Sequence, residues 1–284
     1  FFLQAAGVWA SDNSFFAARR EALMKKIDGA VAVLQGAPDT RAYAAFRQDN
    51  NFYYLTGVET PDALLLLDAS RHRSILFLPA RDEAAERWEG PRLYAGPEAR
   101  RQSGIDEVLD LSQFGAELEK RKSSFRELYA PFSPQELAAT SRDRALQHDS
   151  ARQNDPWDGR LSRESTFEKN LQAKLGPEVR IKDLSPLLDE MRRVKDAQEI
   201  ERLREAGRIS ALGFKEAIRS ARPGNYEYQI AAVAADLRAL YGPATPVVTL
   251  QNGIPWWYFH RHGGPLAGTR LESVDPGGLI GAQL

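Results

Sequence analysis

The sequence predicts an α/β protein, and three patterns in it carry that prediction. Helix-like and strand-like periodicities alternate along the first half of the chain. Two uninterrupted apolar runs, residues 63–67 and 74–78, are typical of strands buried on both faces of a sheet. Residues 184–241 repeat apolar side chains every three or four positions, as helices that cover a sheet do. We therefore expect a mixed sheet flanked by helices.

Composition narrows the classes of protein and of partner. The 284 residues can form two domains with a sizeable core, and 43% hydrophobic and 27% charged residues are typical of a soluble globular chain. The 38 Lys and Arg residues balance the 39 Asp and Glu residues, so no field of one sign favours nucleic acid or an anionic membrane. The absence of cysteine excludes disulfides, thiolate metal sites and a cysteine nucleophile. No apolar run approaches the roughly 20 residues of a membrane span.

The first half alternates helices and strands. A helix over residues 14–27 stops at Gly29, and a short apolar strand over residues 30–34 follows. The apolar strands 63–67 and 74–78 are joined by the polar turn DASRHR. Further helices are expected over residues 81–88, 97–103 and 111–121, and a further strand over residues 127–131.

The middle of the chain changes character. Residues 133–165 are polar, poor in branched apolar side chains and broken by Asp155-Pro156 and Asp158-Gly159, so we place them on the surface as an insertion or loop. A helix over residues 166–175 and a last strand at 179–181 follow. We expect the domain boundary near residues 182–185, which gives a start at 1–13, a first domain at 14–182 and a second at 183–284.

The second domain begins with a pair of helices. Ile200, Leu203, Phe214 and Ile218 form one apolar stripe, and Arg222-Pro223-Gly224 ends that helix. Asn225 can cap a second helix, and the sheet that both would cover is expected after Gly242-Pro243.

The first ten residues, FFLQAAGVWA, are apolar and precede a polar stretch. This pattern is typical of the end of a secretory signal, and equally of a frayed apolar start. The compartment, secreted or periplasmic in the first case and cytoplasmic in the second, stays open.

Several motifs resemble one family. Residues 46–57, FRQDNNFYYLTG, resemble the N-terminal signature of aminopeptidase P, in the creatinase/prolidase metallopeptidase superfamily. The resemblance continues through residues 61–66 and 81–90, and residues 191–200 and 222–228 are similar to the entry of the catalytic domain of that family. It implies a creatinase-like N-terminal domain followed by the incomplete start of a pita-bread α+β domain.

The resemblance also implies an activity. Members of the family are Xaa-Pro aminopeptidases, which remove the N-terminal residue that precedes proline in peptides. They hold a pair of divalent metal ions, often Mn²⁺, with two Asp, one His and two Glu, and a bridging hydroxide on such a pair is a strong nucleophile. Peptides with proline at the second position are the implied partners, and a homo-oligomer, dimer or tetramer, is the implied assembly.

Three residues of the second domain match family positions. Asp275 resembles the first metal-ligating aspartate, and His260 resembles the substrate-contacting histidine, with His262 as a competing assignment. Without the resemblance, Asp275 is an ordinary turn residue in Asp-Pro-Gly and His260 a packed or surface residue. The stretch GTRLESVDP departs from the apolar strand that relatives have at this place. The other metal ligands of the family are expected beyond this chain. We therefore expect the chain to be inactive alone and to bind no metal.

Other candidate residues favour structural roles. His72, between two arginines in a turn, and His148, in the polar insertion, are expected to be solvated. Asp49, Trp88 and Arg92 fall in the N-terminal signature, where a structural role is favoured for Trp88.

Three hypotheses follow. The first is a Xaa-Pro aminopeptidase whose metal site this chain only begins. The second is a non-catalytic module for oligomerisation or peptide binding, built on a creatinase-type N-terminal domain. The third keeps the superfamily but changes the reaction to that of a creatinase- or prolidase-type hydrolase.

Overall fold

The computed structural model describes residues 13–39, 46–134 and 142–227, without the side chains of Trp88 and Glu89. The described chain divides after Asp196. The unit before this point contains a six-stranded sheet and its covering helices, and the unit after it begins with helix α9, Ala197–Ser220. No helix within the described ranges is long and apolar enough to cross a membrane.

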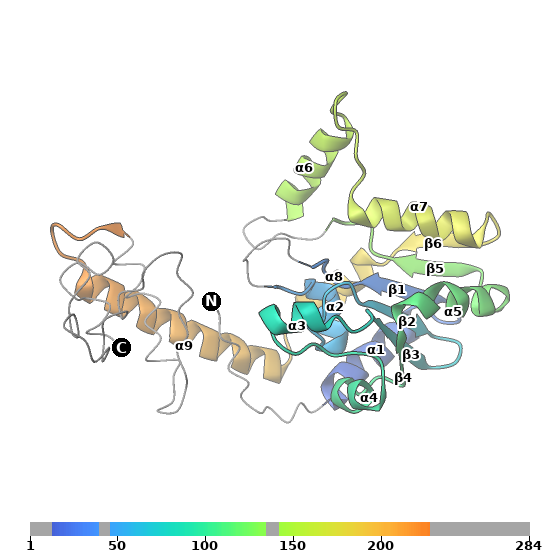
Figure 1. Ribbon diagram of the computed structural model, residues 1–284, viewed down its shortest axis with the longest axis horizontal. Coiled ribbons are helices and arrows are strands. Elements are labelled where there is room, and N and C mark those ends of the chain that lie inside the picture. The colour runs from blue at the N-terminus through green and yellow to red at the C-terminus, as the bar shows by residue number, and fades with distance from the viewer. Residues whose placement is uncertain (1–12, 40–45, 135–141, 228–284) are drawn as a thin grey trace. The chain divides into compact units, whose positions relative to one another are not determined.

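The sheet has the strand order β4-β3-β2-β1-β5-β6 and mixed pairing (Figure 1). Strand β2 pairs antiparallel with β1 and β3, while β5 pairs parallel with β1 and β6, and β3 pairs parallel with β4. The strands are β1 (Val31–Gln35), β2 (Leu64–Asp68), β3 (Arg73–Leu78), β4 (Glu107–Asp110), β5 (Glu127–Ala130) and β6 (Arg180–Asp183).

Helices cover both faces of the sheet because the central strands alternate buried side chains toward both faces. Leu65 and Leu67 of β2 belong to one apolar cluster, and Leu64 and Leu66 to the other. The first cluster lies under α1 (Ser14–Lys26), α2 (Asn50–Thr56), α4 (Pro97–Ser103) and α8 (Ser185–Arg193), and the second under α5 (Phe114–Arg121) and α7 (Arg163–Leu175). The predicted mixed sheet flanked by helices is therefore confirmed for this unit.

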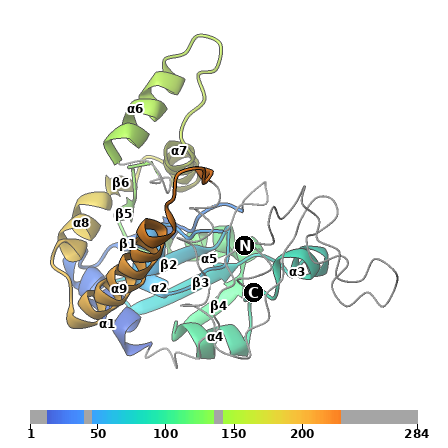
Figure 2. The ribbon, with the colours of Figure 1, turned by 90° about the vertical axis from the view of Figure 1, so that its left-hand side faces the viewer.

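The polar segment 133–165 contains a helix that the sequence analysis did not predict. Helix α6, Arg142–Gln153, stands clear of the sheet in both views (Figures 1 and 2). Its polar side chains pair three or four residues apart, as Asp149 does with Arg152 and Gln153, which stabilises a helix without a buried face. A regular helix therefore lies within residues 133–165, and the placement of this segment as a surface insertion or loop stays a prediction.

The remaining differences are short elements. Helix α2 and strand β4 were not predicted. The residues of α2, NNFYYLT, are mostly weak helix formers. Strand β4, EVLD, has only two apolar residues, between two acidic ones, at the sheet edge. Helix α3 (Glu83–Glu89) and the 3-10 turns η1 (Leu111–Gln113) and η2 (Lys122–Ser124) complete the described elements before Asp196.

The predicted domain boundary at residues 182–183 stays a prediction. Leu184 and Leu188, at the start of and within α8, are fully buried in the first apolar cluster, so α8 belongs to the same compact unit as the sheet. Helix α9 confirms the predicted long helix, and its apolar stripe is exposed, with Phe214 at 70% and Ile218 at 74%. The predicted second helix and the sheet after Pro243 lie outside the described residues.

Candidate functional site

The motif FRQDNNFYYLTG centres on a buried glutamine. Gln48 is 5% exposed, and its Oε1 accepts hydrogen bonds from the backbone N–H of Ala37 (2.6 Å) and of Asp49 (2.9 Å). Its Nε2 donates to the carbonyl oxygens of Val58 (3.1 Å) and Thr60 (3.0 Å). One side chain thus satisfies backbone groups of the loop after β1 and of the loop before β2, which would otherwise be buried without partners.

The rest of the motif forms and ends helix α2. Asp49 is the N-cap, and its Oδ1 accepts from the backbone N–H of Asn51 and Phe52, both at 2.9 Å. Gly57 ends the helix with φ of +66°, and a Cβ at this position would lie 2.5 Å from Cε2 of Phe16. Only glycine combines this left-handed conformation with so close a neighbour.

Two arginines of α1 hold the carboxyl end of α2. Arg19 donates to the carbonyl of Tyr54 at 3.1 Å, and Arg20 donates to that of Leu55 at 3.0 Å. Positive charge at a helix C-terminus is favourable because the last carbonyls carry partial negative charge. Burial lowers the pKa of Arg20 to about 10, partly offset by Asp106, so the side chain stays protonated at neutral pH.

The signature residues therefore connect helices α1 and α2 to each other and to the loops that flank β1 and β2. Gln48 and Asp49 bond to backbone groups, and the motif contains no histidine or cysteine. Among the residues that the structure describes, no three His, Asp or Glu side chains are grouped as a metal site would require. The hydrogen bonds of Gln48 and Asp49 thus give the motif a structural role in this unit.

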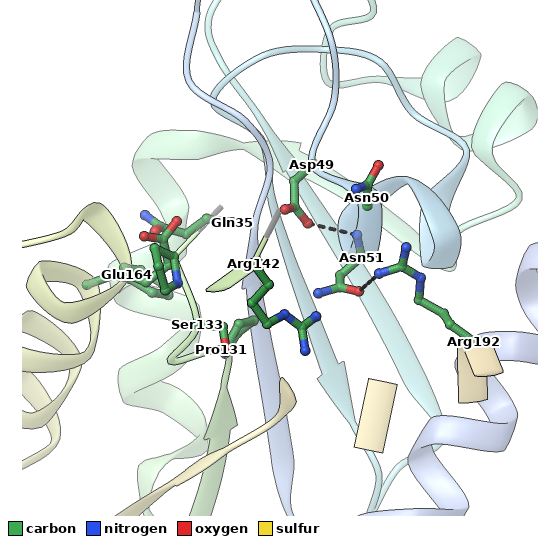
Figure 3. A pocket seen from close by; sticks show the side chains of 11 residues that line it. Gln35, Asp49, Asn50, Asn51, Pro131, Ser133, Arg142, Glu164 and Arg192 are labelled. Carbon is green, nitrogen blue, oxygen red and sulfur yellow. Dashed lines mark hydrogen bonds between the residues drawn. The ribbon is translucent and has the colours of Figure 1, made fainter. Parts of the chain in front are cut away.

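A pocket lies beside the motif, at the carboxyl ends of the neighbouring parallel strands β1 and β5 (Figure 3). It contains about 540 Å³ of empty space, counting the part open to solvent. Open α/β sheets commonly bind ligands at this edge of the sheet. The lining residues are Gln35, Asp49, Asn50, Asn51, Pro131, Ser133, Pro134, Arg142, Glu164, Phe167 and Arg192.

The arginines of the pocket belong to a small polar network. Arg192 of α8 donates from Nη1 to the side-chain oxygen of Asn51 at 2.6 Å. Arg142, the first residue of α6, donates from both terminal nitrogens to Asp189 of α8, with 2.8 Å for the longer bond. The hydrogen bonds from Arg142 lower the pKa of Asp189, and the charge of Arg192 contributes to the same effect. The charged and amide side chains of the lining can form hydrogen bonds and ion pairs with a polar ligand.

The site residues predicted from the sequence fall into two groups. His260, His262 and Asp275 lie outside the described residues, so their predicted roles stay predictions. His72 is solvated as predicted and adopts a positive φ of 49° in the β2–β3 turn, with Nδ1 3.3 Å from Glu21. His148 is exposed as predicted, but on helix α6 rather than on a loop.

The signature residues have structural contacts. Asp49 caps α2, and Arg92 forms an ion pair with Asp39 at 2.9 Å. The expected structural role of Trp88 stays a prediction, since only its backbone in α3 is described. Sequence reasoning missed the pocket residues Gln35, Glu164 and Arg192, which are far apart in the chain. The one available signal was that Gln35 ends an apolar strand with a polar side chain.

The comparisons with known proteins agree with this geometry. Residues 16–129 match the family model described as aminopeptidase P, N-terminal domain. Among the curated relatives is the Xaa-Pro aminopeptidase of Escherichia coli K12, 31% identical over 225 residues, which are 76% of this chain and 46% of that protein. This chain carries the N-terminal domain of the aminopeptidase P family.

Other members extend the match. The Xaa-Pro aminopeptidase of Haemophilus influenzae is 32% identical over 188 residues, 65% of this chain and 36% of that protein. Aminopeptidase P from E. coli, solved with the inhibitor Pro-Leu, superimposes with a TM-score of 0.57 at 27% identity, covering 78% of this chain and 48% of that one. The chain thus spans less than half the length of these aminopeptidase P relatives.

A relative with another activity matches a shorter stretch. A 2-dehydropantoate 2-reductase from Mesorhizobium japonicum is 45% identical over 87 residues, which are 28% of this chain and 27% of that protein. The family match at residues 16–129 and the fold relate the sheet unit to the N-terminal domain of the aminopeptidase P family.

Proposed function

We propose that this chain is part of a Xaa-Pro aminopeptidase, which hydrolyses the bond between the N-terminal residue of a peptide and a following proline. The observation that carries the proposal is the match to the E. coli Xaa-Pro aminopeptidase across 76% of this chain, well beyond the N-terminal domain alone. Peptides with proline at the second position are the substrate class that follows from it.

The catalytic residues of the proposal lie outside the described part. Asp275 would be the first metal ligand, and His260, or His262 in its place, would contact the substrate. A pair of divalent ions, Mn²⁺ in the first instance, would supply the activated water. The side chains described here do not fit such a pair, because no three metal-type ligands come together among them.

The 284 residues alone are expected to be inactive. After Asp275, residues 276–284 contain no Asp, Glu or His, so the further ligands that the family requires are absent from this sequence. Purified chain should release no alanine from Ala-Pro-Gly at any Mn²⁺ concentration. Manganese-dependent release would contradict the expectation of an incomplete site.

The activity itself needs a separate experiment. The gene read past the codon for Leu284 should encode an Asp, then a His and two Glu. The product of that longer reading frame should hydrolyse Ala-Pro-Gly with Mn²⁺ and leave Ala-Ala-Gly intact. Equal hydrolysis of both peptides would contradict the proposed specificity for proline at the second position. Hydrolysis of neither peptide would refute the proposed function. Light scattering of the same product would test the proposed dimer or tetramer.

A second candidate is a non-catalytic module for oligomerisation or peptide binding. The 87-residue match to the reductase favours it, since a chain that joins parts of two unrelated families need not keep the activity of either one. The same sequencing separates the two candidates. A continuation that resembles the reductase would support the module, and the Asp, His and Glu series would support the peptidase.

A further inference from the structure

The pocket at the ends of β1 and β5 has two ends of opposite character. Gln35 and Glu164 lie at one end, Arg192 lies at the other, and Arg142 is between them (Figure 3). All four side chains belong to the sheet unit, and they come from β1, α7, α8 and α6. The site therefore needs no residue of the second domain.

The first end provides acceptors. The Oε1 atom of Gln35 is buried and has no hydrogen-bond partner among the described residues. Glu164 adds a carboxylate from the first turn of α7. A buried acceptor without a donor is unfavourable, and the side chain of Gln35 lines the pocket. A small turn of its amide toward the pocket therefore lets a ligand N–H supply the missing hydrogen bond.

The second end provides donors. The guanidinium of Arg192 bonds to the neutral amide of Asn51, and that of Arg142 bonds to Asp189. Asp189 interacts electrostatically with both arginines, so two cations share this carboxylate at the pocket wall. A planar guanidinium is well suited to hold a ligand carboxylate by two parallel hydrogen bonds.

We propose that this pocket binds a small zwitterion, a free amino acid or a dipeptide, with its ammonium group at Gln35 and Glu164 and its carboxylate at Arg192. The ring of Phe167 and the prolines Pro131 and Pro134 form the apolar part of the lining, against which a ligand side chain packs. The site is separate from the proposed peptidase centre, and its test requires no activity.

The first experiment titrates the 284-residue chain calorimetrically with glycylglycine and with glycine, which distinguishes a dipeptide from an amino acid. N-acetylglycylglycine lacks the ammonium group, and glycylglycinamide lacks the carboxylate. The zwitterion that binds should bind at least about tenfold more tightly than its analogue lacking either charge. No heat from either zwitterion at millimolar concentrations, or equal binding of the acetylated peptide, would overturn the proposal.

The second experiment changes the two ends separately. Arg192→Gln should weaken binding of the zwitterion about tenfold and leave binding of glycylglycinamide unchanged. The matched control is Arg193→Gln, which removes the neighbouring exposed arginine, paired with Glu190 on the same helix, and should change nothing.

At the other end, Gln35→Met keeps the length of the side chain and removes its acceptor. It should lower the affinity for the zwitterion toward that for the acetylated peptide. If the Gln35→Met chain fails to fold by circular dichroism, Glu164→Gln makes the same test on the half-buried first turn of α7. Unchanged discrimination between the zwitterion and the acetylated peptide in the folded variant would overturn the proposed orientation.

Discussion

Two polar stretches of the sheet unit use their polar side chains in opposite ways. In residues 46–57, Gln48 bonds to groups up to 12 positions away in the sequence, and α1 reaches the same block across 35 positions. In residues 142–161, most of the polar side chains pair within two to four positions, as Arg160 does with Asp158 and Asn154 with Ser150. Arg142 bonding to Asp189 is the long-range exception.

The difference between these two stretches shows that a family motif can have a structural role. Hydrogen bonds to distant buried backbone groups restrict Gln48 to one residue type, because a changed side chain leaves several groups without partners. Local pairs on an exposed helix can be exchanged for others at little cost. The family signature thus reports a structural requirement of the sheet unit. Four substitutions test this comparison, from the largest expected effect to the smallest.

Gln48→Leu should have the largest effect. It keeps the approximate volume but leaves the N–H of Ala37 and the carbonyls of Val58 and Thr60 without partners in a buried site. We expect the free energy of unfolding to fall by about 3 to 5 kcal/mol, measured by urea denaturation. Gln147→Leu on exposed α6 is the control. A loss below about 1 kcal/mol in Gln48→Leu would break the comparison.

Gly57→Ala should come next. The added Cβ meets the ring of Phe16 and also strains a residue with φ of +66°. Gly29→Ala is the matched control, since Gly29 has φ of +70° and no atom within 4 Å of the added Cβ. We expect about 1 kcal/mol of destabilisation in the control from the left-handed backbone and about 3 kcal/mol in Gly57→Ala. Equal losses would show that Phe16 moves aside freely.

Asp68→Asn tests whether burial or the sequence distance of the bonds decides the cost of a substitution, because Asp68 combines local hydrogen bonds with burial. Its carboxylate is 1% exposed and accepts from Ser70 Oγ and Arg71 Nη1, both at 2.7 Å. Burial by itself raises the pKa of this carboxyl, but the hydrogen bonds from Ser70 and Arg71 outweigh it and hold the pKa below 3.8. The ionised form is therefore favoured by folding.

The sign of the pH dependence follows. The contribution of Asp68 to stability is present above pH 3.8 and is lost as the pH falls through the lower folded-state pKa. Asp68→Asn should cost about 2 kcal/mol near pH 7, and the gap to the unchanged protein should close in acid. Urea denaturation at several pH values measures it, with exposed Asp28→Asn as the control. A gap that widens in acid would contradict the assigned direction.

Trp157→Ser should have the smallest effect. This indole is 96% exposed in the loop after α6, so its removal takes no contact from the core. We expect the free energy of unfolding to change by less than about 0.5 kcal/mol. A larger loss in thermal denaturation would mean that the exposed segment contributes to the stability of the sheet unit, and would remove the contrast with residues 46–57.

The sequence by itself determined the fold class and most of the elements of the sheet unit. Burial on both faces requires the continuous apolar runs of β2 and β3, and the helix periodicities of α1, α5 and α7 repeat over two turns or more. The same reasoning missed α2, β4 and α6, because α2 is made mostly of weak helix formers, β4 has only two apolar residues and α6 has no continuous apolar face.

Only the tertiary structure decided the roles of the polar residues. Whether Gln48 is a buried hydrogen-bonding residue or a surface residue depends on the backbone groups that two loops bring to it. The pocket brings together Gln35, Glu164 and Arg192, which are spread over more than 150 positions of the sequence. Hydrophobic periodicity is a local property that a sequence displays directly. The partner of a hydrogen bond is set by chain crossings distant in the sequence, and these exist only once the sheet has formed.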